Sequence, residues 1–362
     1  MAAPVQARPF FRRHPALASH FALAELAQLP TPLRRMDALA ARLSLSDLYL
    51  KDDGCSSRIY GGNKVRKLEL LLGLARADGA REVLTFGYAG SNHAAATAVH
   101  AAALGMRGIS MLMPQENAAY LRTNLLVSAA VGAELHEYDG IAGVAAGAAW
   151  QLVRHRMLTG VSPFRIAPGG SSALGTVGFV ASAFELVEQM ESMALPPPAA
   201  VYVPAGSMGS AVGLALGLAL LAVPTRVHAV RVTDSRFVNE RRARALWTAT
   251  VRLLRAGDSS VGAAAFDPQR LQIRDGFFGG VYAKATDEGT EAAMLAERLE
   301  ALRLDVSYTS KTMACLISDA RHGLVREGPV VFWNTYNSVD LAPLAAKANV
   351  GDLPPRLRRY FD

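Results

Sequence analysis

The chain has 362 residues, of which 51% are apolar and 19% charged, and its formal net charge at pH 7 is +7. This composition excludes an intrinsically disordered protein, and the length predicts two domains, because a single core rarely grows that large. The modest positive charge is scattered among acidic residues, so it favours small anionic ligands over nucleic acid. The two cysteines, Cys55 and Cys315, predict no disulfide framework and suit a reducing cytoplasm.

No segment predicts secretion or a membrane span. The pair Phe10-Phe11 is too short for the apolar core of a signal peptide. Residues 211–223 carry no charge, but they are far fewer than a bilayer span needs. We therefore expect a buried helix at 211–223 and a soluble protein without a membrane partner.

The first informative element in chain order is a turn that leads into a helix at residues 61–69, Gly-Gly-Asn-Lys-Val-Arg-Lys-Leu-Glu. A strand is predicted just upstream, at 48–51. Lys64 falls in the first helical turn, where the positive end of the helix dipole opposes its charge. Such a placement lowers the pKa of an amine, as a nucleophilic, Schiff-base-forming lysine requires. The alternative is that Lys64 is a solvated cation beside Arg66 and Lys67.

Two series of strands and helices follow. In the first, strands at 83–86, 109–113 and 135–138 precede helices at 92–104, 117–131 and one that ends near 156; Gly105 and Gly132 close the first two helices as left-handed caps. After prolines at 196–198, the second series has strands at 201–203, 227–232 and 330–333 and a charged helical insertion at 236–256. This alternation predicts an α/β protein with two open, twisted, mostly parallel sheets flanked by helices, and a ligand crevice at the carboxyl ends of the strands.

Three turns are suited to bind an anion. Residues 87–93, Gly-Tyr-Ala-Gly-Ser-Asn-His, open a helix whose free N–H groups can hold a carboxylate or phosphate, although a plain helix cap explains them equally well. Residues 205–210, Ala-Gly-Ser-Met-Gly-Ser, form a phosphate nest that lacks the P-loop ending and the dinucleotide spacing, so ATP and NAD are poor candidates. Residues 169–172, Gly-Gly-Ser-Ser, are either a third such turn or a flexible crossover between the sheets.

A candidate Schiff-base lysine, an asparagine-containing turn and a glycine-serine loop, in this order, resemble the pyridoxal-phosphate enzymes of the tryptophan synthase β type. More narrowly, the chain resembles the family of D-cysteine desulfhydrase and 1-aminocyclopropane-1-carboxylate deaminase. The resemblance runs from about residue 30 to 337 and is carried by residues 48–53, 61–69, 90–93, 169–172, 206–210 and 304–311. It implies a large cofactor-binding domain of residues 1–60 and 170–362, a small domain of residues 61–169, and a homodimer.

The resemblance also implies roles for individual residues. Lys64 would bind pyridoxal 5'-phosphate through a Schiff base, and Asn92 would hydrogen-bond its ring hydroxyl. The cofactor's phosphate would be held by Gly206, Ser207, Met208, Gly209 and Ser210. The substrate carboxylate would be received by Ser91, Asn92 and His93. Catalysis would involve Lys64, Ser91, Tyr282 and Tyr308, and no metal is implied.

Thr309 falls where this family places the partner of the cofactor's ring nitrogen, a glutamate in the deaminases and a threonine in the desulfhydrases. A hydroxyl leaves that nitrogen neutral, which favours loss of a β leaving group over opening of a cyclopropane ring. The resulting hypothesis is a lyase that acts on a small amino acid by α,β-elimination and yields a keto acid, ammonia and sulfide or another leaving group. The configuration of the substrate stays open.

The chain departs from the family pattern at several positions, and these keep other functions open. Ala94-Ala95-Ala96 follow His93 where a polar pair is usual, Ser307 replaces a proline, and Asn334-Thr335-Tyr336-Asn337 stand in place of His-Thr-Gly-Gly. Tyr336 and Asn337 add bulk near the cofactor ring. The alternatives are a β-replacement synthase, a 1-aminocyclopropane-1-carboxylate deaminase, and a non-catalytic binding protein that retains the fold.

Overall fold

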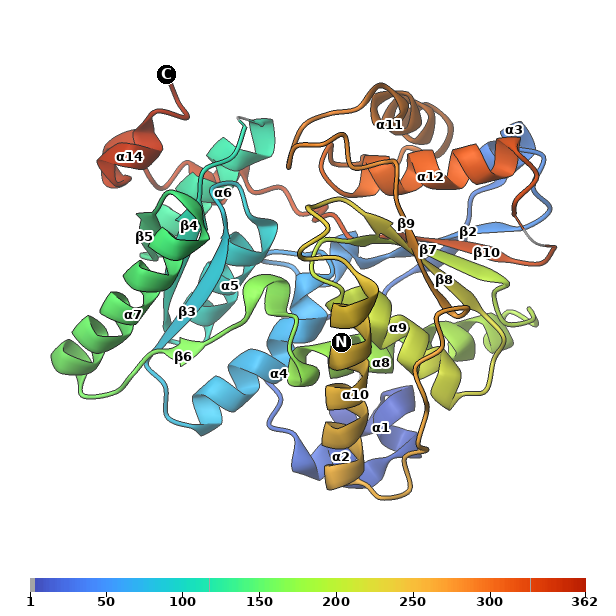
Figure 1. Cartoon of the computed structure of the whole chain (residues 1–362), viewed down its shortest axis with the longest axis horizontal. Coiled ribbons are helices and arrows are strands. Elements are labelled where there is room, and N and C mark those ends of the chain that lie inside the picture. The colour runs from blue at the N-terminus through green and yellow to red at the C-terminus, as the bar shows by residue number, and fades with distance from the viewer. Residues whose placement is uncertain (1–3, 117, 326) are drawn as a thin grey trace.

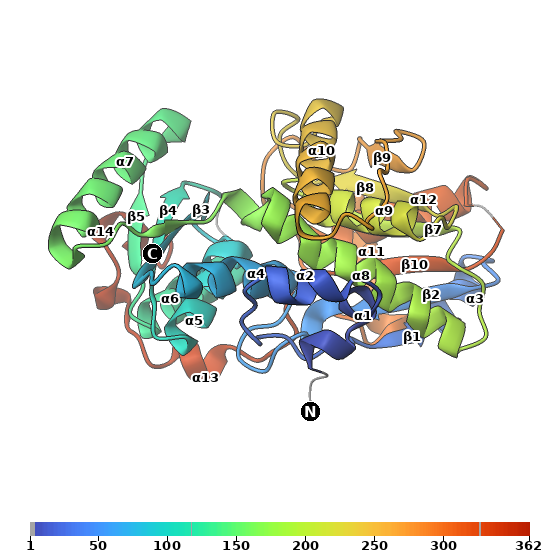
Figure 2. The ribbon, with the colours of Figure 1, turned by 90° about the horizontal axis from the view of Figure 1, so that it is seen from below.

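Two open sheets, each flanked by helices, lie side by side in the computed structural model, which describes residues 4–116, 118–325 and 327–362 (Figures 1 and 2). One sheet has six strands in the order β1-β2-β10-β7-β8-β9, and the other has four in the order β5-β4-β3-β6. Every neighbouring pair of strands is parallel except β1 with β2. The predicted fold class is therefore confirmed.

The elements have the following bounds. The six-stranded sheet comprises β1 (Leu33–Arg35), β2 (Leu48–Asp52), β10 (Val330–Asn334), β7 (Ala200–Ala205), β8 (Arg226–Arg231) and β9 (Leu271–Arg274). The four-stranded sheet comprises β5 (Glu134–Glu137), β4 (Arg107–Met113), β3 (Glu82–Tyr88) and β6 (Phe164–Arg165). The longer helices are α4 (Lys64–Ala77), α5 (Asn92–Ala103), α6 (Ala119–Ala130), α7 (Gly140–Thr159), α8 (Ala173–Ser192), α9 (Gly209–Leu220), α10 (Glu240–Gly257), α11 (Asp287–Glu300) and α12 (Thr309–Arg321). The short helices are α1 (Pro9–Arg13), α2 (Pro15–His20), α3 (Asp37–Arg42), α13 (Ala342–Ala345) and α14 (Pro355–Arg358).

The six-stranded sheet is buried on both faces, which explains the near-continuous apolar character of its central strands. In β7, Val201 and Val203 pack with α8 and α9 on one face, whereas Tyr202 packs with α11 and α12 on the other. This division follows the two-residue period of a strand. Figure 1 shows α11 and α12 above the sheet and α8 and α9 below it.

The topology brings the glycine-rich turns together. Parallel strands point the same way, so the segments that follow β2, β3, β7 and β10 all emerge at carboxyl ends of the two sheets. Helix α4 lies between the two layers, because it packs on α8 of one and on α5 of the other (Figure 2). Lys64 is the first residue of α4 and is therefore presented at the junction of the sheets.

Most of the predicted elements are confirmed, with small shifts at their ends. The helices predicted at 92–104, 211–223 and 236–256 are α5, α9 and α10, and Gly105 and Gly132 have the positive φ of left-handed caps. Asn117, where a helix was predicted to begin, lies outside the described residues, and α6 starts at Ala119. The strands β1, β6 and β9 were not predicted, because edge strands of two to four residues carry too little alternation.

The predicted domain boundaries, residues 1–60 with 170–362 and residues 61–169, stay a prediction.

Within residues 4–116, 118–325 and 327–362, none of the helices combines the length and the apolar character that crossing a bilayer requires.

A cluster of buried charges fixes the start of α4. The Arg66 guanidinium donates to both oxygens of Asp53 at 2.9 and 3.0 Å and to both oxygens of Glu185 on α8 at 3.0 and 2.9 Å. Lys51 of β2 pairs with the same Glu185, and the indole of Trp333 in β10 donates to Asp53 at 2.8 Å. Burial disfavours the charged form of Glu185, yet the cations beside it hold its pKa well below the usual range. Desolvated charges of this kind stabilise a fold only while every partner is present.

Replacing Arg66 by methionine is expected to lower the free energy of unfolding by about 3–5 kcal/mol, because buried Asp53 loses its cation and Glu185 keeps only Lys51. Urea denaturation followed by far-UV circular dichroism measures the change. The matched control is Arg321→Met, which removes an exposed ion pair with Glu291 and is expected to leave stability nearly unchanged. Equal effects of the two substitutions would contradict the structural role assigned to the cluster.

Candidate active site

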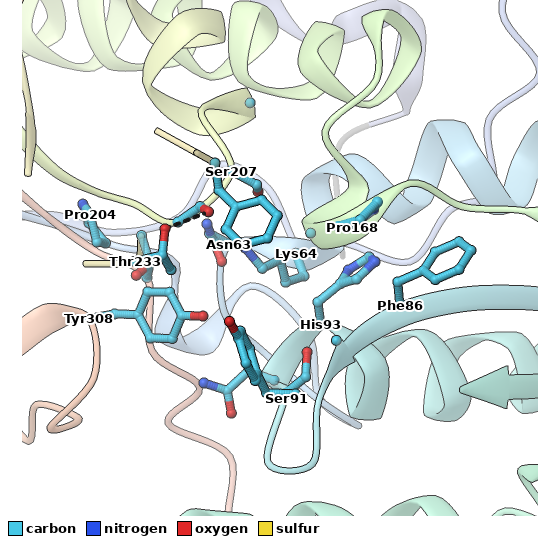
Figure 3. Close-up of a pocket in the computed structure, with 18 of the residues that line it drawn as sticks. Asn63, Lys64, Phe86, Ser91, His93, Pro168, Pro204, Ser207, Thr233 and Tyr308 are labelled. Atoms are coloured by element: carbon cyan, nitrogen blue, oxygen red, sulfur yellow. Dashed lines mark hydrogen bonds between the residues drawn. The ribbon is translucent and has the colours of Figure 1, made fainter. Parts of the chain in front are cut away.

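A cavity of about 270 Å³ opens at the carboxyl ends of both sheets. It brings together all but one of the residues that the sequence singled out: Lys64, Ser91, Asn92, His93, Gly206, Ser207, Met208, Gly209, Ser210, Tyr282 and Tyr308 line it, and Thr309 does not. Figure 3 shows Lys64 in the middle of the cavity, with Ser207 above it, His93 and Tyr308 on opposite sides and Ser91 below.

Lys64 is half-buried at the wall of the cavity and carries a perturbed amine. Burial lowers its pKa to about 8, and the attraction of the nearby Asp305 carboxylate only partly opposes that shift. The pKa is therefore shifted in the predicted direction, and the largest cause is the loss of water. Among the residues that the structure describes, none donates to or accepts from Lys64 Nζ. The amine is therefore available to a ligand.

The backbone before Lys64 requires glycine. Gly62 has φ +87°, and a Cβ at this position would lie 2.8 Å from the carbonyl oxygen of Thr335. The turn thus packs directly on the segment that follows β10. This contact brings Thr335, Tyr336 and Asn337 to the wall of the cavity.

The loop between β7 and α9 forms an anion cradle, together with the turn at residues 169–172. Met208 adopts a left-handed conformation, with φ +68°, at the N-terminus of α9. The Ser171 hydroxyl lies 2.9 Å from that of Ser207 and accepts from Gly209 N at 3.1 Å. Hydroxyl and backbone N–H groups at a helix N-terminus converge here, an arrangement that binds phosphate. The turn at 169–172 is therefore both a crossover between the sheets and part of the cradle.

Lys67 adds a cation that sequence reasoning had treated as a solvated neighbour. It is 1% exposed, and its amine donates to the Gly169 carbonyl at 3.1 Å and to Ser171 Oγ at 3.2 Å. Burial, and then the nearby Lys64, hold its pKa well below the usual range. A bound phosphate would supply the missing counter-charge. In the sequence, this role of Lys67 is indicated by its place three residues after Lys64, on the same face of the helix.

The start of α5 forms the opposite wall. Ser91 caps the helix by accepting from Ala94 N at 3.2 Å. His93 contacts Thr85 Oγ1 through Nε2 at 2.9 Å, and burial lowers its pKa well below the usual value, so the ring is neutral at pH 7. A neutral imidazole can donate one hydrogen bond but does not contribute a full charge to anion binding.

Three aromatic rings line the side where Tyr308 lies. The hydroxyls of Tyr282 and Tyr308 are 2.6 Å apart, and Tyr88 stacks on Tyr282 with ring centroids 4.1 Å apart. Burial raises the pKa of both Tyr282 and Tyr308, so each keeps its proton at neutral pH. The pair can pass a proton to a group in the cavity.

Thr309 lies behind residues that line the cavity and does not line it. It is fully buried, and its hydroxyl donates to Asp305 Oδ1 at 2.6 Å. The same carboxylate accepts from the backbone N–H groups of Ser307, Tyr308 and Thr309, and so it caps α12. In this arrangement Thr309 supports Asp305, which lines the cavity and which the sequence analysis had not singled out. The predicted contact of Thr309 with a cofactor ring stays a prediction.

A contact between the layers closes this side of the site. The Tyr120 hydroxyl on α6 lies 2.7 Å from Ser307 Oγ, which belongs to the segment before α12. A proline at position 307 could not make this contact. Ser307, which departs from the family pattern, therefore provides a hydrogen bond between α6 and the segment before α12.

Comparison with known proteins identifies the family. A model of the family described as "Pyridoxal-phosphate dependent enzyme" matches residues 24–335. D-cysteine desulfhydrase of Salmonella typhi is 34% identical over 325 residues, 88% of this chain and 94% of that protein. Nocardicin C-9' epimerase of Nocardia uniformis subsp. tsuyamanensis is 32% identical over 342 residues, 92% of this chain and 96% of that protein. The crystal structure of an ACC deaminase homologue superposes with a TM-score of 0.78 and 28% identity, covering 97% of this chain and 99% of that one. The chain belongs to the family of pyridoxal-phosphate-dependent enzymes.

The cavity fits pyridoxal phosphate. The hydroxyls and N–H groups of the cradle, with Lys67 beside them, suit its phosphate, and a Cβ at Gly209 would lie 2.5 Å from Ser171 Oγ and close that space. The partner-free amine of Lys64 suits covalent attachment to its aldehyde. When bound, the cofactor supplies a ring that accepts the electrons released at the substrate's α-carbon.

Borohydride reduction of the cofactor-loaded protein is expected to fix the cofactor on Lys64, because this amine is free whereas Lys67 donates to two protein oxygens. Peptide mapping by mass spectrometry locates the label. Lys67→Met is the matched control: it should retain a reducible visible chromophore and bind the cofactor more weakly, whereas Lys64→Ala should lack the chromophore. Label on Lys67 in the wild-type protein would contradict the assignment.

The rate of cofactor attachment should depend on the pKa of Lys64. Because that pKa is lowered from 10.5 to about 8, the uncharged amine predominates above pH 8. The initial rate at which apoprotein gains visible absorbance should therefore rise from pH 7 and level off above about pH 8. A rate that still climbed tenfold per pH unit between pH 9 and 10 would indicate an ordinary lysine.

Proposed function

We propose that this pyridoxal-phosphate-dependent enzyme is a lyase that removes a β leaving group from a small amino acid by α,β-elimination. The observation that carries the proposal is a partner-free, low-pKa Lys64 amine in one cavity with the hydroxyl pair of Tyr282 and Tyr308. Such a cavity offers a base for the α proton and a separate acid for the leaving group. The similarity to D-cysteine desulfhydrase supports sulfide as one leaving group.

The proposed steps assign a proton to each group. The substrate carboxylate is oriented by the N-terminus of α5, at Ser91, Asn92 and His93. Lys64 Nζ takes the α proton, and the electron pair of that C–H bond forms a double bond to the β-carbon as the bond to the leaving group breaks. The leaving group takes a proton from the tyrosine pair. Water then hydrolyses the released enamine to a keto acid and ammonia.

The Thr309 hydroxyl donates to Asp305, and its contact with the ring nitrogen stays a proposal. Thr335 at the end of β10 lines the cavity and offers a hydroxyl at a different place on its wall. We propose that the ring nitrogen meets a hydroxyl, of Thr309 or of Thr335, and not a carboxylate. A hydroxyl at that nitrogen disfavours a 1-aminocyclopropane-1-carboxylate deaminase.

Epimerisation is a second candidate. Inverting an α-carbon requires one group to remove a proton and another to return it on the other side. Lys64 and Tyr308 come from different elements and both line the cavity. The similarity to nocardicin C-9' epimerase over almost the whole chain supports epimerisation as the second candidate reaction.

The setting of the enzyme is also a proposal. Cys55 and Cys315 are both free, which is consistent with a reducing cytoplasm. A homodimer follows from the family resemblance alone. We propose a small amino acid as the substrate and neither a nucleic acid nor a membrane as a partner.

Incubating the loaded enzyme with D-cysteine, L-cysteine or β-chloroalanine is expected to release a keto acid without any added nucleophile, as measured with a coupled reductase. Tyr308→Phe should lower kcat by about 10²-fold, because the leaving group loses its proton donor. Tyr138→Phe, outside the cavity, is the control.

The same incubation in D₂O separates the candidates. Deuterium at the α-carbon with inverted configuration and no keto acid would replace the lyase proposal by the epimerase. A keto acid that vanishes in favour of a thioether when a thiol is added would indicate a β-replacement synthase. No change in the cofactor's spectrum with any amino acid would favour the non-catalytic alternative.

A further inference from the structure

The side chain of Asn92 is held by a buried hydrogen-bond chain that lies behind the cavity wall. We propose that Asn124, a residue of α6 outside the cavity lining, is a positioning residue that turns the Asn92 amide so that its NH₂ group faces the bound cofactor. The inference rests on the cofactor site of the proposed function, but not on which reaction the enzyme performs.

The first link fixes the orientation of Asn124. Its Nδ2 lies 3.0 Å from the carbonyl oxygen of Gly90, which can only accept a hydrogen bond. The NH₂ of Asn124 must therefore be on that side. Its Oδ1 then accepts from the Tyr60 hydroxyl at 3.0 Å, which completes the second half of the amide. Asn124 is 4% exposed, so no water competes for these positions.

The second link transfers this orientation to Asn92. The remaining N–H of Asn124 Nδ2 donates to Asn92 Oδ1 at 2.8 Å, and the Tyr60 hydroxyl lies 3.3 Å from the same oxygen. The single Tyr60 proton goes to Asn124 Oδ1, the closer of the two oxygens, so Asn124 Nδ2 is the donor that fixes this end of the Asn92 amide. If the amide were reversed, its NH₂ would face the NH₂ of Asn124, donor against donor.

The consequence is a defined donor at the wall of the cavity. Within the described ranges 4–116, 118–325 and 327–362, no acceptor lies in hydrogen-bond range of Asn92 Nδ2, although Asn92 lines the cavity. The group that occupies this position must therefore be an acceptor. A phenolate oxygen of the cofactor ring meets this requirement, because it only accepts hydrogen bonds.

Asn124→Asp tests the proposal at constant side-chain volume. The introduced carboxylate cannot donate to Gly90 or to Asn92, so the Asn92 amide should rotate to donate to that carboxylate and present its oxygen to the cofactor. We expect the cofactor dissociation constant to rise about tenfold or more and the visible absorption band of the lysine-bound cofactor to shift. Ser128→Ala is the matched control, because Ser128 is a buried polar residue one turn further along α6 that donates only to the Asn124 carbonyl. It should leave both readouts unchanged.

A double-mutant cycle distinguishes positioning from general support of the fold. In an Asn92→Ala background, Asn124→Asp should have no further effect on cofactor affinity, because the group through which it acts is gone. Asn124→Leu serves as an uncharged second variant if the aspartate prevents folding. Unchanged affinity in the folded single variants, or an equal loss with and without Asn92, would overturn the proposal. A wild-type protein that fails to bind pyridoxal phosphate would instead overturn the cofactor site itself.

Discussion

The structure depends on the burial of Arg66 between two carboxylates. Arg66 lies two residues after Lys64, and its partners Asp53 and Glu185 come from the turn that follows β2 and from α8. One guanidinium therefore ties the start of α4 to both elements that flank it. A charge removed from water is costly unless it is fully paired, so the position of α4 tolerates little variation. Arg66 does not line the cavity, yet it fixes the point at which Lys64 enters it.

Three cations within four residues of α4 show how environment assigns function. Arg66 is saturated by carboxylates, Lys67 donates to two oxygens of the cradle, and Lys64 has no protein partner in the described part of the chain. All three are withdrawn from water, yet only Lys64 combines a lowered pKa with a free lone pair. Burial alone would make a weakly basic amine, and burial without a partner makes a reactive one.

The parallel sheets, the helices between them and the turns around the cavity could be predicted because their signals are local: alternation, glycine caps and apolar spacing. Lys64, Ser91, Asn92 and the loop 206–210 were found in the same way, since each lies in a turn between a strand and a helix. Thr309 could be placed beside Tyr308 but not oriented, because its direction depends on Asp305, four residues earlier. Lys67 and Asn124 depend on contacts about 100 and 30 residues away in the chain, for which periodicity carries no information.

Helix α6 makes two contacts that respond differently when the cavity opens. Tyr120 reaches Ser307, beside the tyrosine pair, and Asn124, one turn further, reaches Asn92 at the base of the cavity. Both side chains extend from one helix, which packs on α5 in the four-stranded layer. Widening the gap between the sheets would therefore break the bond to Ser307, whereas α5 and α6 would move together and keep the contact between Asn124 and Asn92. Opening the cavity to let a molecule pass would thus leave the orientation of the Asn92 amide intact.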